Sequence, residues 1–261
     1  MRLILFCDEN GIETFDKAVG VGQLDAIVVA KNRPQAFKII KKRKDIKGVP
    51  IFVQPFKGDK KKIKKFIGDL KNLKPDLILV NSYSMILPKE ILDIPKRGAI
   101  NIHGAMLPKY RGANVLNWVL INGEKETGIT LHYMNEDIDA GDIIAQTKIK
   151  ISFTDTASTL KRKFARTVIT LLKKEWPNII NNNVRRMPQD NSIATVVHRR
   201  KPEDGLIDWS KPAIEIYNLI RALVKPYPGA YYFDKKGNKI IIDKFLPLQK
   251  VKKLQNKILK K

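Results

Sequence analysis

Short apolar runs alternate with stretches of helical spacing through the first hundred residues of the chain. The apolar runs predict strands at residues 3–6, 25–30, 51–53 and 76–80. Helical spacing predicts helices at 12–19 and 34–40, and a third that Asp59 can cap, with an apolar stripe of Ile63, Phe66, Ile67 and Leu70. Strands that alternate with helices predict a parallel, doubly wound sheet. Gly-x-Gly-x-x-Gly does not follow the first strand, so the usual dinucleotide-binding fingerprint is absent.

The pattern continues into shorter elements after residue 110. It predicts a helix at 113–121, strands at 128–134 and 143–151, a helix at 156–172 that Pro177 ends, a strand at 194–197, a helix at 213–223, and hairpin strands at 231–233 and 239–242. The composition turns polar near 178–190, so we expect a main domain at 1–185 and a short C-terminal region at 186–261. The predicted fold class is α/β: a Rossmann-like, mostly parallel, doubly wound sheet with a small C-terminal α+β appendage that ends in a β-hairpin.

The charge of the chain is strongly positive. Lysine and arginine number 50 against 26 acidic residues, a net charge of +24 over 261 residues. Such a charge favours anionic partners, although a Lys-rich surface that only maintains solubility explains it equally well. The tail 249–261 could form a basic amphipathic helix lined by Val251, Leu254 and Ile258, but we favour a frayed, solvated tail.

Cysteine usage and hydropathy restrict the location and the class of site. The single cysteine, Cys7, excludes an internal disulfide and a cysteine metal cluster, and its place in the first apolar run predicts an inert core thiol. No group of residues suggests a metal site. No signal peptide and no apolar run long enough to span a bilayer are visible, so we expect a cytoplasmic protein.

Candidate chemistry gathers where strands end. Asn101 and His103 follow directly after the apolar run at 98–100, and alternate strand residues point to one face. Asp139 follows in the loop 135–141 after the next strand, and open α/β sheets place their sites at this edge. A histidine base, an amide donor for an oxyanion and an orienting carboxylate would suit acyl transfer. Asp142 is a weaker candidate for the carboxylate, and His132, alone inside a strand, is expected to be structural.

The stretch 101–142 resembles the folate-dependent formyltransferases, a family that includes the enzymes acting on methionyl-tRNA, glycinamide ribonucleotide and amino sugars. The resemblance rests on Asn101-x-His103, on the segment 105–108 and on Ile138-Asp139-Ala140-Gly141, with further matches at 206–230. Ala105 and Met106 replace the Ser and Leu of the family pattern, so a hydroxyl near the site is missing. The resemblance implies N10-formyltetrahydrofolate as co-substrate, with Asn101, His103 and Asp139 as the catalytic residues.

The resemblance also implies ligand contacts. It places the folate against Tyr83, Met85, Ile86, Leu87, Asp137 and Ile138, with backbone contacts from 85–87 favoured over side-chain chemistry. A nucleotide-linked amino sugar would be held by Lys109, Tyr110, Arg111, Arg199, Arg200 and Lys201, and the arginines could instead belong to a solvated loop. Sugar N-formyltransferases, in particular the 4-amino-arabinose formyltransferase domain, are the branch most similar to this chain. That branch implies a homodimer formed through the C-terminal hairpin and a role in lipopolysaccharide or O-antigen synthesis.

Other functions remain open from the residues. The +24 charge and the lysines at 57–65 would suit a basic nucleic-acid-binding module or a methionyl-tRNA formyltransferase, although those lysines occupy one helix face away from the predicted site. A catalytically inactive folate or nucleotide sensor is a third possibility. We favour the sugar enzyme because only about seventy residues follow the main domain, and we expect no nucleic-acid partner.

Overall fold

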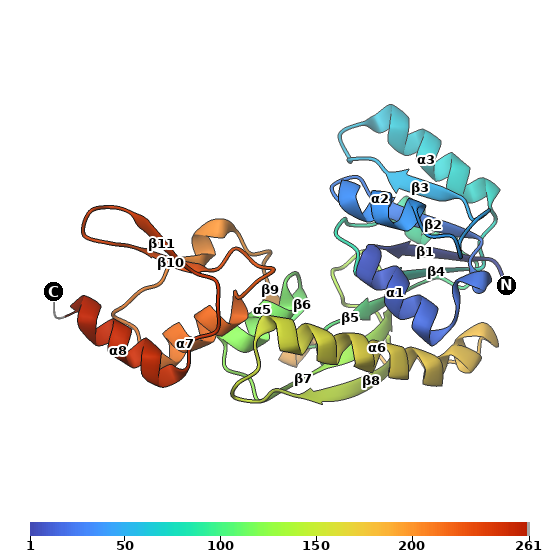
Figure 1. The fold of residues 1–261 in the computed structure, drawn as a ribbon. Helices are drawn as coiled ribbons and strands as arrows, with labels where there is room; N and C mark the ends of the chain where they lie inside the picture. The colour runs from blue at the N-terminus through green and yellow to red at the C-terminus, as the bar shows by residue number, and fades with distance from the viewer. Residues whose placement is uncertain (260–261) are drawn as a thin grey trace. The chain divides into compact units, whose positions relative to one another are not determined.

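A seven-stranded sheet forms the centre of the computed structural model, which describes residues 1–259 (Figure 1). Its spatial order is β3-β2-β1-β4-β5-β7-β8. The strands are β1 (Leu3–Cys7), β2 (Ala26–Ala30), β3 (Ile51–Gln54), β4 (Leu77–Asn81), β5 (Ala99–His103), β7 (Glu126–Tyr133) and β8 (Ile143–Lys150). The five strands β1 to β5 pair in parallel, whereas β7 pairs antiparallel to β5. The predicted mostly parallel α/β sheet is confirmed.

Helices cover both faces of this sheet. They are α1 (Glu9–Ala18), α2 (Pro34–Lys41), α3 (Lys60–Asn72), α4 (Lys89–Leu92) and α6 (Ala157–Ile180). On one face, Ile4 and Ile78 of the strands form a buried cluster with Phe66 of α3 and Ile91 of α4. On the other face α1 and α6 meet, because Phe15 packs edge-on against the Trp176 ring at 5.7 Å (Figure 1). Strands buried on both sides explain why their sequences read as continuous apolar runs.

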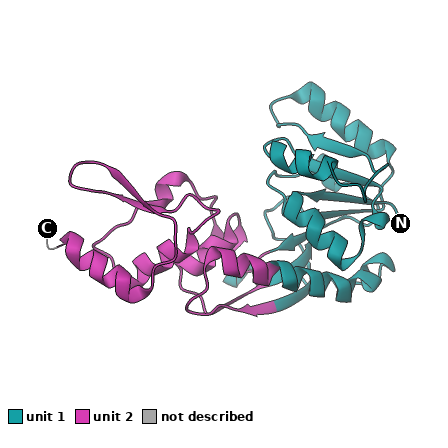
Figure 2. Ribbon diagram, in the orientation of Figure 1, with its two compact units in different colours: residues 1–103, 129–147, 165–193 teal, residues 104–128, 148–164, 194–261 magenta. Residues whose placement is uncertain are grey.

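The chain divides into two compact units (Figure 2). The first unit contains residues 1–103, 129–147 and 165–193, and the second contains 104–128, 148–164 and the residues from 194 onward. Each unit is thus assembled from separate pieces of the chain. The division at 185/186 drawn from composition stays a prediction about domains. Within residues 1–259, no helix combines the length and the apolar composition needed to cross a membrane.

The second unit has its own small core. Its elements are β6 (Arg111–Gly112), α5 (Val115–Ile121), β9 (Val196–Val197), α7 (Ala213–Ala222), β10 (Ala230–Phe233), β11 (Lys239–Ile242) and α8 (Leu248–Leu259). A short 3₁₀ helix lies at Pro202–Gly205 in this unit, and two more, at Val21–Gln23 and Asn191–Ile193, belong to the first unit. The core joins Tyr217 and Ile220 of α7 with Ala230 of β10 and Val251 of α8, all fully buried. Strands β10 and β11 form the predicted antiparallel hairpin.

Pro177 does not end its helix, contrary to expectation. Proline removes one helical hydrogen bond and its ring crowds the carbonyl four residues earlier, so an interior proline is normally a break. Here α6 continues to Ile180, and the residues around the proline are buried: Trp176 packs on Phe15, and Ile179 is 3% exposed. Tertiary packing of this last turn offsets the local cost of the proline.

The C-terminal tail is a packed helix, so the favoured frayed tail is wrong. Val251 of α8 is fully buried in the core of the second unit. The Gln255 side-chain amide donates to the backbone carbonyls of Trp209 at 2.7 Å and Lys211 at 2.8 Å. These contacts stabilise the amphipathic helix, which was the other structure that the sequence predicted for the tail. The last two lysines of the predicted tail lie outside the described residues.

Candidate active site

The predicted pair of Asn101 and His103 lies at the C-terminal end of β5. Alternation along the strand places both side chains on one face of the sheet. The His103 ring is buried, with 6% of the residue exposed, and the Asn101 side chain is half-buried. The antiparallel strand β7 places His132 directly opposite Asn101 in the register. An amide and two imidazoles therefore gather at this edge of the first unit.

Asp139 completes the group from the loop between β7 and β8. Its backbone has a φ of 53°, in the left-handed region that aspartate tolerates better than most residues. Its Oδ2 lies 3.4 Å from Nδ1 of His103, and its Oδ1 lies 3.5 Å from Nε2 of His132. The Asn101 amide donates to Oδ1 at 3.2 Å. Asp139 thus contacts both of the other residues predicted as catalytic.

Two residues hold the Asp139 loop in place. The Gln189 amide donates to the backbone carbonyls of Asp139 at 2.8 Å and Gly141 at 2.7 Å. A Cβ at position 141 would lie 2.1 Å from the Tyr133 carbonyl oxygen, so only glycine allows this approach. Gln189 was missed by sequence reasoning because it lies fifty residues beyond the loop, and no local pattern marks it.

The arrangement can perform acid–base chemistry on one substrate atom. Asp139 faces Nδ1 of His103 and can stabilise the cation that forms when the ring takes a proton. The Asn101 amide supplies a donor of the kind that stabilises a developing oxyanion. Among residues 1–259, no group of three or more His, Cys, Asp or Glu side chains is placed to hold a metal ion.

The predicted folate segment follows β4 and is held by hydrogen bonds to a side chain at the end of β3. Gln54, at the end of β3, donates its amide to the Ile86 carbonyl at 3.1 Å and accepts from the Tyr83 hydroxyl at 2.7 Å. Burial raises the pKa of Tyr83, which keeps this hydroxyl a donor. Leu87 is 4% exposed and belongs to the core, whereas Met85 is half-buried. Tyr83 and Leu87 therefore belong to the packing beneath the segment and shape its backbone.

Exposed apolar side chains remain on the loops of this edge. Ile86 is 76% exposed, and Ile138 is 57% exposed in the loop that carries Asp139. Asp137 beside it is also exposed. Isolated exposed apolar residues are common, but both isoleucines here follow strands of the sheet that carries the catalytic group. They are available to cover a flat ligand.

The second unit brings together the two predicted cationic segments. Strands β6 and β9 pair in parallel, with Arg111 opposite Val196, so the chain around 109–112 lies beside 196–201. The Arg200 guanidinium lies over the Trp118 ring, 5.0 Å from its centroid. The backbone N–H of Arg200 donates to Oδ1 of Asn114. The Tyr110 hydroxyl donates to Glu124 at 2.6 Å, and burial with this bond raises its pKa to about 12. Arg111 is buried, whereas Lys109, Arg199 and Lys201 are exposed.

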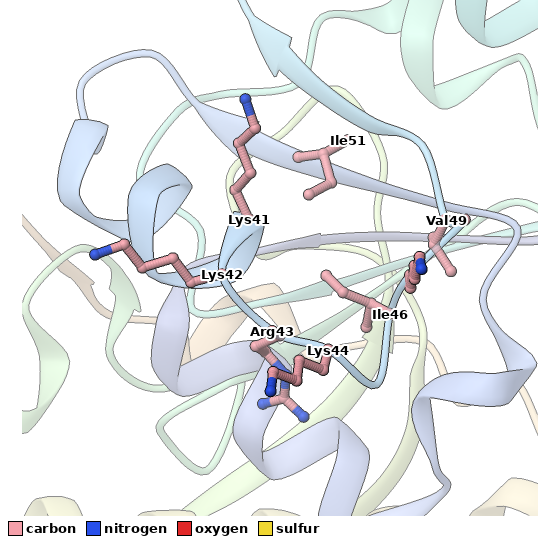
Figure 3. Close-up of a pocket in the computed structure, with 9 residues that line it drawn as sticks. Lys41, Lys42, Arg43, Lys44, Ile46, Val49 and Ile51 are labelled. Carbon is pink, nitrogen blue, oxygen red and sulfur yellow. The ribbon is translucent and has the colours of Figure 1, made fainter.

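A basic hollow elsewhere in the first unit lacks the groups for this chemistry. It lies between α2 and β3 and is lined by Lys41, Lys42, Arg43, Lys44, Ile46, Lys47, Gly48, Val49 and Ile51 (Figure 3). This segment leads into the N-terminal end of β3, the edge opposite to the C-terminal end of β5. Arg43 donates to the carboxylates of Asp16 and Asp45. The residues that line the hollow include no histidine and no carboxylate, so we place the proposed reaction at the other edge.

Comparisons with known proteins identify the family of the chain. Residues 8–173 match the formyl transferase family, and residues 199–257 match the formyl transferase C-terminal domain. The chain belongs to the formyl transferase family. The predicted family is thereby confirmed.

Two curated relatives each match about two thirds of this chain. The chain is 50% identical over 174 residues to the bifunctional polymyxin resistance protein ArnA of Wigglesworthia glossinidia brevipalpis, covering 66% of this chain and 27% of that protein. It is 46% identical over 167 residues to the methionyl-tRNA formyltransferase of Alkaliphilus oremlandii (strain OhILAs), and this match covers 64% of this chain and 54% of that protein. The chain thus spans about a quarter and about half of these relatives.

Solved structures of formyltransferases share the fold. A 4-N formyltransferase from Francisella tularensis superposes with a TM-score of 0.77 at 23% identity, covering 94% of this chain and 98% of that one. An N-formyltransferase from Helicobacter canadensis, in complex with folinic acid and dTDP-3-aminofucose, gives a TM-score of 0.64 at 23% identity, covering 90% and 85%. At this identity the likeness establishes the fold of the formyltransferase family for this chain.

Proposed function

We propose that this protein transfers the formyl group of N10-formyltetrahydrofolate to the primary amine of a nucleotide-linked amino sugar. The observation that carries the proposal is the contact of Asn101, His103 and Asp139 at the C-terminal edge of the sheet. A base, an oxyanion donor and a carboxylate are the groups that acyl transfer to an amine requires.

The proposed mechanism assigns one task to each residue. Neutral His103 takes a proton from the attacking amine through Nε2, because Asp139 faces its other ring nitrogen. The Asn101 amide donates to the oxygen of the tetrahedral centre, and loss of one such donor typically costs about 3 kcal/mol. Asp139 stabilises the His103 cation that this step forms. The protonated His103 then gives its proton to the folate nitrogen as the bond between that nitrogen and the formyl carbon breaks.

The folate is proposed to lie against the segment after β4. Ile86 and Ile138 supply exposed apolar surface for a flat ring, and residues 85–87 supply backbone donors and acceptors. The neighbour from Helicobacter canadensis holds folinic acid, a formylated folate, and this supports the same co-substrate here. Asp137 completes the proposed contacts.

A nucleotide-linked amino sugar is the proposed acceptor. The same neighbour holds dTDP-3-aminofucose, and the Francisella tularensis neighbour is described as a 4-N formyltransferase. Lys109, Arg111, Arg199 and Lys201 offer positive charge for a diphosphate on two paired segments. Such sugars are precursors of polysaccharides, so the proposal places the reaction in the cytoplasm before lipopolysaccharide or O-antigen assembly.

Initiator methionyl-tRNA is the second candidate acceptor. It is favoured by the 46% identity to a methionyl-tRNA formyltransferase and by the +24 charge, since lysines can follow a phosphate backbone. Coverage does not separate the two candidates, because the match spans 54% of this relative and 27% of the polymyxin resistance protein.

A competition assay separates the two acceptors. Purified protein with N10-formyltetrahydrofolate is offered charged initiator tRNA and a panel of UDP-, dTDP- and GDP-linked 3- or 4-amino sugars. We expect one sugar to gain a formyl group by mass spectrometry while tetrahydrofolate is released. Catalytic formylation of the tRNA with every sugar unchanged would reject the sugar proposal, and no transfer to either would reject the enzyme.

We further propose a homodimer that forms through the hairpin. The register places Tyr231, Phe233 and Ile241 on one face of β10 and β11, while Tyr232 and Ile242 on the other face pack on the core of the second unit. Phe233 is 55% exposed and Ile241 is 54% exposed. A second copy of the chain would cover this apolar face.

A further inference from the structure

His132 is placed to control the side chain opposite it. It lies on β7 in register with Asn101 on β5, and only 1% of the residue is exposed. Its Nδ1 lies 2.7 Å from the Tyr133 carbonyl oxygen, and its Nε2 lies 3.1 Å from Nδ2 of Asn101. Both ring nitrogens therefore have a partner.

The Tyr133 carbonyl places a hydrogen on Nδ1 of His132, while Nε2 faces both Nδ2 of Asn101 and, at 3.5 Å, Oδ1 of Asp139. A carbonyl oxygen can only accept, so Nδ1 carries the hydrogen in this contact. In the neutral ring Nε2 then presents a lone pair. The atom of the Asn101 carboxamide that faces it must be a donor, which is the NH₂ group.

A second neighbour requires the same orientation of the carboxamide. Nδ2 of Asn101 also lies 3.2 Å from Oδ1 of Asp139, and a carboxylate oxygen accepts. If the carboxamide turned over, its oxygen would face both the carboxylate and the imidazole lone pair, two repulsive contacts. His132 and Asp139 together therefore hold the NH₂ group toward the site.

The two contacts differ in how easily they can be released. Asp139 belongs to a loop, and its side chain is 13% exposed, whereas the His132 side chain is 1% exposed and fixed at its other nitrogen. When an oxyanion develops, it can replace Asp139 Oδ1 as the acceptor of one amide hydrogen while His132 keeps the other, so the planar carboxamide does not turn. A donor that is oriented beforehand avoids reorganisation during the reaction.

We infer that His132 is a positioning residue that orients the Asn101 amide as an oxyanion donor, an inference that rests on the proposed formyl transfer. His132 acts through Asn101 and does not touch the reacting atoms. Its expected purely structural role in a strand is replaced by a functional one. No motif in the sequence reveals it, because the contact depends on the antiparallel pairing of β5 with β7.

The first experiment measures formyl transfer in four variants: His132→Leu, His132→Gln, Asn101→Ala and the double variant with Leu at 132 and Ala at 101. We expect His132→Leu to lower kcat about tenfold to a hundredfold, with the folate KM and the thermal midpoint nearly unchanged. His132→Gln should stay within about fivefold of the natural protein, because its side-chain oxygen can accept from Asn101.

The double variant separates positioning from general structural damage. If His132 acts through Asn101, replacing it in the Asn101→Ala background costs no further activity. Losses of kcat that multiply in the double variant, or a His132→Leu protein with normal kcat, would overturn the inference while leaving formyl transfer intact.

A second measurement does not depend on turnover. The chain contains three histidines, so ¹⁵N-histidine NMR gives three sets of ring signals, and the set lost in His132→Gln belongs to His132. We expect the Nδ1–H form for His132 at neutral pH. A ring protonated at Nε2 would overturn the inference whether or not the protein formylates any acceptor, whereas absence of formylation with the expected tautomer would count against the proposed reaction alone.

Discussion

Asp139 has a left-handed backbone conformation, and this unfavourable conformation places its carboxylate between two imidazoles. Left-handed φ values cost a residue other than glycine roughly 1 kcal/mol or more, and Asp139 has a φ of 53°. The conformation places Oδ1 and Oδ2 near two different imidazoles. Such local cost is typical of functional positions, and it separates Asp139 from Asp142, whose backbone carbonyl accepts from the Tyr133 N–H in the sheet.

Replacing this carboxylate tests its role at the scale of one residue. We expect Asp139→Asn to lower kcat about a hundredfold or more, because the neutral amide cannot stabilise the His103 cation. Asp142→Asn is the matched control and should stay within about threefold. Steady-state formyl transfer measures both, and a larger loss at 142 would move the role to that residue.

At the scale of elements, the loop between β7 and β8 is held by backbone geometry. Gly141 approaches the Tyr133 carbonyl more closely than any residue with a Cβ could. Gln189 clamps the same loop through two carbonyls. The position of Asp139 therefore depends on residues that take no part in the chemistry.

Adding a Cβ at position 141 should lower both the stability of the fold and the turnover. We expect Gly141→Ala to reduce the free energy of unfolding by about 1–3 kcal/mol, since its Cβ would lie 2.1 Å from a carbonyl oxygen. It should also lower kcat by displacing Asp139. Gly68→Ala in α3, where a Cβ meets open space, should instead stabilise by roughly 0.5–1 kcal/mol. Urea unfolding and kinetics report the two effects, and equal behaviour of both variants would refute this view of the loop.

The start of α6 offers a pH-dependent test. Burial alone would raise the pKa of Asp155, but hydrogen bonds from the Lys163 ammonium, the Ser152 N–H and the Thr159 hydroxyl outweigh it and hold the pKa below its usual value. A depressed folded pKa contributes stability that is fully present above the unfolded pKa of about 3.9. That contribution is lost as the pH falls through the lower folded value.

We therefore expect Asp155→Asn to destabilise the protein by about 1–2 kcal/mol at neutral pH. The difference from the natural protein should shrink below about pH 4. Denaturant unfolding across this range measures it. Glu215→Gln is the control, because its exposed ion pair with Lys211 spans 3.8 Å and such pairs contribute little. A difference that does not change with pH would show that the Asp155 charge is not what stabilises the helix start.

At the scale of the whole molecule, one face of the hairpin lies away from the core of its own unit and carries Tyr231, Phe233 and Ile241 beside Lys239. A two-stranded hairpin is marginal alone, and here only one face packs on a core. The proposed dimer would bury the other face. The same unit carries the cationic segments 109–111 and 199–201, so assembly and substrate binding are proposed for one unit.

The dimer is tested by mass in solution. We expect light scattering at micromolar concentration to give twice the mass of the 29.8 kDa chain. Ile241→Glu should yield a folded monomer, because a buried charge without a partner opposes association. Ile39→Glu, at a 50% exposed isoleucine of α2, should leave the dimer intact. A monomeric natural protein would contradict the proposal.

The sequence was sufficient for the elements and for the family. Continuous apolar runs and helical stripes specify local structure and burial on both sheet faces, so the strands and helices of the first hundred residues could be placed to within a few positions. Asn101 and His103 were found because strand alternation is local. Asp139 was a candidate from its place after a strand, but preferring it to Asp142 needed the family resemblance, because a carboxylate in a loop carries no periodic signal.

Contacts between distant segments required the folded chain. His132 reaches Asn101 only through the register of β7 on β5, and Gln189 reaches the Asp139 loop from fifty residues away. The turn of α6 around Pro177 and the helix α8 depend on packing against Phe15 and within the core around Tyr217. Local propensity sets preferences worth a few kcal/mol at most, and burial against partners remote in the sequence can exceed them. The proposed catalytic pair on β5 was therefore readable from the sequence, whereas the residues proposed to orient it were brought there by strand pairing and packing.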